Sequence, residues 1–157
     1  MAEEQDPGTA YCDPLDRYLP LDHPYFSYIS HIRLAQASLG IAASDSKKLE
    51  VTKSFIEILD TLSENLFDPD TVLQDSVRKP MNHVEDVWLD MKEKMMQGDV
   101  RGASLLSAHS HLKIALGYLV ILRKDDTFRE YVTDYLLKYM GKLSIMIYRE
   151  AMGHVLL

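Results

Sequence analysis

The chain has 157 residues, of which 46% are hydrophobic and 26% are charged, and these values are ordinary for one globular domain. Acidic residues outnumber basic residues 24 to 17, which gives a net charge of −7. Nucleic-acid binding depends on lysine and arginine side chains that neutralise phosphates. The composition therefore argues against DNA or RNA as a partner.

The cysteine content and the N-terminal residues indicate in which cellular compartment the protein is located. Cys12 is the single cysteine, so no internal disulfide can form, which is typical of reducing compartments. The first residues are acidic, whereas a secretory signal begins with positive charge and an apolar run. The longest near-continuous apolar run, residues 114–122, is shorter than the roughly 20 residues that cross a bilayer. We therefore expect a cytoplasmic protein without a membrane partner.

Residues 1–21 are expected to form an irregular arm. Pro7, Pro14 and Pro20 disfavour helix, because proline restricts its own backbone and that of the preceding residue. The rest of the chain, residues 22–157, is expected to form a single domain.

Apolar residues recur at helical spacing through most of this domain. The pattern predicts helices over about 22–40, 46–66, 81–97 and 100–124, and a last helix from Asp126 almost to the C-terminus. The helix over 100–124 is apolar nearly all round, which is typical of the centre of a bundle. No internal repeat of whole units is expected. The sequence predicts an all-α, antiparallel bundle of about five main helices with a central apolar helix.

Histidine and glutamate side chains are the candidates for binding a cofactor or metal. Helical bundles hold such groups with ligands that project inward from facing helices. His31, His109 and His111 are candidate cofactor ligands. Glu150 and His154 are four residues apart on one predicted helix face, which makes them candidate metal ligands. The sequence names no cofactor, and we expect none.

The segment over residues 108–113 resembles, in part, the His-x-Leu-Lys signature of histidine phosphotransfer domains, which are also helical bundles. The histidines are displaced from the register of that signature, where Ser110 stands. Ile114 occupies the place of an expected glycine. The resemblance implies His109 or His111 as the phosphoacceptor.

No pattern predicts a catalytic residue. The sequence has no Gly-x-Ser-x-Gly elbow, glycine-rich phosphate loop or Cys-x-x-Cys pair. Cys12 precedes Asp13, and a negative neighbour raises the pKa of a thiol rather than activating it. The sequence therefore favours a protein that is not an enzyme.

Tyrosine and methionine side chains point to a binding role. Tyr131 and Tyr135 share one face of the last predicted helix, and Met91 and Met95 share a face of the third. Both residue types suit protein interfaces. The leading prediction is a non-enzymatic interaction module (an adaptor, accessory subunit or small chaperone) that forms a homodimer and contacts partners through these four residues. The alternative is a bundle that binds haem, a metal or an apolar small ligand, with a sensor role.

Overall fold

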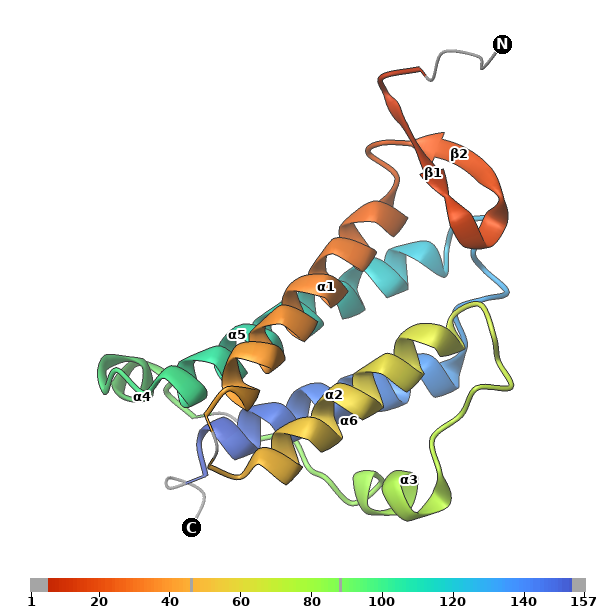
Figure 1. The fold of residues 1–157 in the computed structure, drawn as a ribbon. Helices are drawn as coiled ribbons and strands as arrows, with labels where there is room; N and C mark the ends of the chain where they lie inside the picture. Colours follow the sequence, from red (N-terminus) through yellow and green to blue (C-terminus); the bar gives the residue numbers. More distant parts are fainter. Residues whose placement is uncertain (1–5, 46, 88, 154–157) are drawn as a thin grey trace.

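The computed structural model describes residues 6–45, 47–87 and 89–153. It is mostly helical, with one small two-stranded sheet (Figure 1). The elements in chain order are β1 (Thr9–Cys12), a 3₁₀ turn (Asp13–Leu15), β2 (Arg17–Pro20), α1 (Pro24–Ala43), α2 (Leu49–Asn65), α3 (Asp75–Met81), α4 (Lys92–Met96), α5 (Val100–Leu122) and α6 (Asp134–Ala151).

The four long helices form two layers (Figure 1). One layer holds α1 and α5, which make the most extensive contact in the molecule, and the other holds α2 and α6. His31 of α1 contacts His111 of α5, while Ser38, further along α1, contacts Ser107, which lies earlier on α5. The two helices of this layer therefore run in opposite directions.

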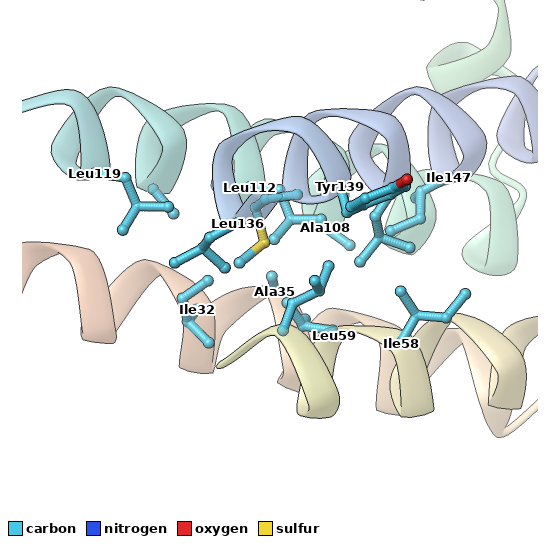
Figure 2. Packing of buried hydrophobic residues seen from close by; sticks show 14 of the residues in the cluster. Ile32, Ala35, Ile58, Leu59, Ala108, Leu112, Leu119, Leu136, Tyr139 and Ile147 are labelled. Carbon is cyan, nitrogen blue, oxygen red and sulfur yellow. The ribbon is translucent and has the colours of Figure 1, made fainter. Parts of the chain in front are cut away.

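The apolar core lies among the four long helices, and Figure 2 shows its side chains between α5 and α6 on one side and α1 and α2 on the other. Ile32, Leu59, Leu112 and Leu136 are at most 1% exposed and come one from each long helix. Full burial of such a side chain contributes about 1.5–3 kcal/mol to stability. The residues that carry the helical period in the sequence are therefore those that hold the layers together.

Helix α5 packs against α1, α6 and α4. Leu105, Leu112 and Leu119 are seven residues apart and completely buried, because this spacing places them on one helix face. Among the described residues α5 alone is long and apolar enough to cross a membrane by length and composition. The buried core helix of a soluble protein passes the same test.

Residues 9–20 of the N-terminal arm form a hairpin, so the predictions of an irregular arm and of an all-α chain are wrong for this segment. β1 and β2 pair in antiparallel register, with Ala10 opposite Leu19 and Cys12 opposite Arg17. Cys12 and Leu19 are buried in the main core. Pro14 lies in the connecting turn and Pro20 at the end of β2. The prolines thus occupy the positions that a hairpin tolerates.

The helix predicted over residues 81–97 does not form as one element. It is replaced by the end of α3, a connection in which no described residue is helical, and the short α4. Side chains of α6 bind the backbone of this connection: Lys142 Nζ donates to the Val84 carbonyl at 2.6 Å, and Tyr148 Oη accepts from the Leu89 N–H at 2.7 Å. Tertiary hydrogen bonds therefore replace the helical ones.

The last helix begins later than Asp126. Residues 125–133 form turns in which the Asp125 carboxylate accepts the N–H of Thr127, and Phe128 is completely buried. Helix α6 starts after Thr133, whose Oγ1 accepts the N–H of Leu136 at 3.1 Å. Threonine is a favoured N-cap residue, and this cap sets the start of the helix.

Candidate functional site

Two of the three candidate cofactor ligands meet at the seam between α1 and α5. The Nδ1 atoms of His31 and His111 are 3.0 Å apart, and Tyr118 stacks on the His31 ring. Burial, and then the neighbouring His31, lower the pKa of His111. In the neutral pair one Nδ1 donates a hydrogen bond and the other accepts it. The two rings therefore satisfy each other at this atom.

His109, the third candidate, lies apart from this pair and faces α6. Its Nδ1 is 2.9 Å from the Ser144 carbonyl oxygen and 3.0 Å from Ser144 Oγ. Because a carbonyl oxygen only accepts, Nδ1 donates to it and Nε2 of the neutral ring carries no proton. Burial is the largest influence on its pKa, which is lowered; Lys113 lowers it further, and Asp86 acts in the opposite direction.

His109 lines a surface pocket of about 400 Å³ between α5, α6 and the connection before α4. The walls include apolar side chains and two of opposite charge, Asp86 and Lys113. Among the described residues no hydrogen-bond partner is found for His109 Nε2. This combination suits a small molecule with an apolar body and a polar group.

The predicted metal pair is only partly visible, since His154 lies outside the described residues. Glu150 Oε1 is 3.2 Å from Arg101 Nη2 and 3.4 Å from Lys48 Nζ. Its carboxylate thus forms ion pairs within the protein. In the described ranges 6–45, 47–87 and 89–153, no three His, Cys, Asp or Glu side chains are grouped so that they could hold a metal ion.

The predicted partner-binding residues occupy two separate places. Helix α4, which carries Met95, lies at the opposite end of the molecule from the start of α6 (Figure 1). Tyr131 packs against Phe67, with ring centroids 5.2 Å apart, and the hydroxyl of Tyr135 accepts the N–H of Leu73.

Exposure differs among these four residues. Tyr131, Tyr135 and Met91 are half-buried against the core, whereas Met95 is exposed. Much of the tyrosine surface is thus already covered from within the chain. Their role in partner binding stays a prediction.

The structure reveals an apolar surface that sequence analysis did not identify. The outward side of the α1–α5 layer exposes apolar and small residues, and we give the name outer α1–α5 surface to six of them: Leu34, Ala37, Ile41, Ile114, Gly117 and Ile121. The exposed fractions of Leu34, Ile41, Ile114 and Ile121 are 47%, 52%, 44% and 47%. Neither α1 nor α5 contains an aspartate or glutamate, although the whole chain is acidic.

A repeat within the sequence underlies this surface. When the sequence of α1 is aligned with that of α5 so that His31 matches His111, Ser30 matches Ser110. Several other residues of the two helices then also match in identity or in character. The matched pairs are Arg33 with Lys113, Leu34 with Ile114, Ala35 with Ala115, Ala37 with Gly117, Leu39 with Leu119 and Ile41 with Ile121. A comparison of the predicted helices with one another, instead of a search for whole repeat units, would have found it.

The repeat explains why the surface is continuous. On each helix the three residues of the outer α1–α5 surface follow the histidine by three, six and ten positions. Residues at these offsets lie about 60–120° around the helix from the histidine, all on the same side of it. The matched apolar pairs therefore flank the seam marked by His31 and His111. Arg33 and Lys113, two positions after these histidines, lie about 160° away from it, at the outer edges of the layer.

Comparison with known proteins adds a family but no assigned activity. No curated protein matches the chain. A family model described as a domain of unknown function (DUF1940) matches residues 11–153, nearly the whole length of the chain, and the protein therefore belongs to this family.

Proposed function

We propose that this protein is a non-enzymatic interaction module on a helical-bundle scaffold, which binds a protein partner through the outer α1–α5 surface. The supporting observation is the exposure of large apolar side chains on two adjacent, rigid helices. Contiguous exposed apolar surface of this kind marks interaction sites in soluble proteins. Adaptor, accessory-subunit and small-chaperone roles all use such a surface.

The charge distribution supports the same assignment. Helices α1 and α5 together carry Arg33, Arg101 and Lys113 and no acidic residue, so the acidic groups all lie elsewhere in the chain. Charged residues are depleted at the centre of protein interfaces and placed at the rim. The outer α1–α5 surface has this composition, with Arg33 and Lys113 at its edges.

Site-specific photo-crosslinking in the producing cells tests the proposal. A photoreactive amino acid replaces Ala37 on the outer α1–α5 surface or, as a matched control, Glu57, which is exposed on α2. We expect discrete protein adducts from position 37 and none from position 57. Equal labelling from both positions, or none from either, would overturn the assignment.

The pocket beside His109 supports a second candidate, the binding of an apolar small ligand. Native mass spectrometry of the purified protein should then show an added mass, and an absorbance spectrum and metal analysis of the same sample identify haem or a metal. Ser110→Trp, at the pocket wall, should remove that mass by filling the space. A protein without bound mass or colour would count against this candidate.

Phosphotransfer through His109 or His111 is a third proposal, and fewer structural observations support it. Neither ring is fully exposed, and each Nδ1 has a partner in the structure. Phosphate transfer from acetyl phosphate, lost in His109→Ala or His111→Ala, would support it.

A further inference from the structure

We infer that the occupant of the outer α1–α5 surface is a second copy of this chain, so that two α1–α5 layers pack face to face in a homodimer. This inference rests on the proposed function and names its partner. The same residues of both copies would form the contact, as in an isologous two-fold interface.

The area of the surface is sufficient for such a contact. Helices α1 and α5 have 20 and 23 residues, and at a rise of 1.5 Å per residue each is about 30 Å long. Two neighbouring helices with axes about 10 Å apart present a face about 20 Å wide. Each copy would bury about 600 Å², giving a total of about 1,200 Å², the lower bound of stable specific interfaces.

The charges favour a protein face over a lipid surface. Recognition of anionic membranes requires a cluster of about four to eight lysine or arginine residues, whereas the edges of this surface carry Arg33 and Lys113 only. A chain with a net charge of −7 is also repelled by anionic lipid. Between two copies, the absence of acidic residues from α1 and α5 keeps negative charges away from the contact.

The internal repeat supplies an independent argument. Leu34 and Ile114, Ala37 and Gly117, and Ile41 and Ile121 occupy equivalent positions in the two helices. Each pair is exposed in the single chain and apolar or small in both helices. Four of these six residues carry large apolar side chains, two on each helix, so covering the matched positions with a second copy would remove apolar area of both helices from water. Ala37, which carries only a methyl group, and Gly117, which has no side chain, let a second layer approach closely.

Light scattering coupled to size exclusion tests the inference. The purified full chain at micromolar concentration should have twice the mass of one chain. Ile114→Glu should give monomers, because the carboxylate would be buried without a partner, and the dimer dissociation constant should rise at least about 100-fold. Val72→Glu, at an exposed apolar residue between α2 and α3, should remain dimeric.

Circular dichroism separates a lost contact from a folding defect. Ile114→Lys should also be monomeric, because an ammonium group would be buried at the contact without a partner, just as the carboxylate would. Circular dichroism should be the same for all variants.

Two results would overturn the inference. One is a monomeric wild-type protein, whether or not it sediments with anionic vesicles; the other is a dimer unaffected by either substitution at Ile114. If the wild type is a monomer while position 37 crosslinks to proteins of other masses, the inference fails and the proposed function stands.

Discussion

Single hydroxyl groups in the core differ in what they bind, and this difference has measurable consequences. Tyr148 Oη accepts the Leu89 N–H at 2.7 Å and donates to the Leu89 carbonyl at 2.6 Å. Tyr28 Oη is buried, and no hydrogen-bond partner is found for it among the described residues. Desolvation accordingly raises the pKa of Tyr28.

Removing these two hydroxyl groups should therefore change stability in different directions. Tyr148→Phe leaves the N–H and carbonyl of Leu89 unpaired, and we expect a loss of about 1–3 kcal/mol in the free energy of unfolding. Tyr28→Phe removes an unsatisfied buried group and should be neutral or stabilising by about 1 kcal/mol. Urea denaturation of both variants measures the difference. Equal destabilisation by both would contradict this account.

The environment of His109 predicts that acid destabilises the protein. Burial lowers its pKa below the usual 6.5, so between these two values the unfolded chain binds more protons than the folded one. Stability from this group is complete above about pH 6.5 and is lost as the pH falls toward the lowered pKa. Each unit of difference in pKa corresponds to about 1.4 kcal/mol.

Replacing the ring isolates this contribution. His109→Asn keeps an N–H donor for the Ser144 carbonyl and removes the titration. The free energy of unfolding, measured by urea denaturation at a series of pH values, should fall less steeply with acid in the variant than in the wild type. Lys113, Asp86 and Tyr148 surround the ring, and none is altered by this change. An identical pH dependence in both proteins would contradict the prediction.

At the scale of elements, the N-terminal hairpin is held to the helices by a small buried surface. Cys12 and Leu19 are 1% and 5% exposed, and Arg17 donates a hydrogen bond to Thr127 Oγ1 at 2.8 Å. Burial is the main cause of the raised pKa of the Cys12 thiol. The thiol therefore reports whether the hairpin is docked.

Reaction with an aromatic disulfide reagent measures this docking. In the wild type Cys12 should react at least about 10-fold more slowly than in the urea-unfolded chain, because the reactive thiolate is disfavoured and covered. Leu19→Asp should release the hairpin and accelerate the reaction while the helical circular dichroism is retained. Tyr18→Asp, at an exposed position of the same strand, is the matched control and should leave the rate unchanged.

Elements whose stability comes from their own apolar period were predictable from the sequence. The helices predicted over 46–66 and 100–124 correspond to α2 and α5 within a few residues at each end. The segment 81–97 was not predictable in this way, because Lys142 and Tyr148, far away in the sequence, bind its backbone. Propensity carries no information about such partners.

In the candidate site, too, some features were predictable from the sequence and others depend on contacts between distant segments. His31 and His111 were identified by residue type, but their contact depends on the opposed directions of α1 and α5. The outer α1–α5 surface escaped prediction because apolar residues all round a helix were assigned to the core. Helical period alone cannot tell which apolar side of such a helix stays exposed; the matched residues of α1 and α5 supply that information.

At the scale of the whole molecule, dimerisation would couple folding to association. When the native dimer unfolds to two separate chains, higher protein concentration favours the folded side, and the melting temperature rises. We expect the wild-type melting temperature to increase across a 100-fold range of concentration. Ile114→Glu, which removes the contact, should melt at a temperature independent of concentration, whereas Val72→Glu should behave as the wild type does.

Substitutions on α5 can also separate the stability that comes from the core of one chain from the stability that comes from the contact between two chains. Leu119 of α5 is completely buried within one chain, so Leu119→Ala should lower the stability by about 2–5 kcal/mol while the dependence on concentration persists. Ile121→Ala, two positions further along on the outer surface, should have a small effect in the monomeric Ile114→Glu background. In the dimeric wild-type background it should cost more, because there it leaves a gap between two chains. Calorimetry of the wild type, the three single variants and the Ile114→Glu/Ile121→Ala double variant checks the distinction. An equal effect of Ile121→Ala in both backgrounds would contradict it.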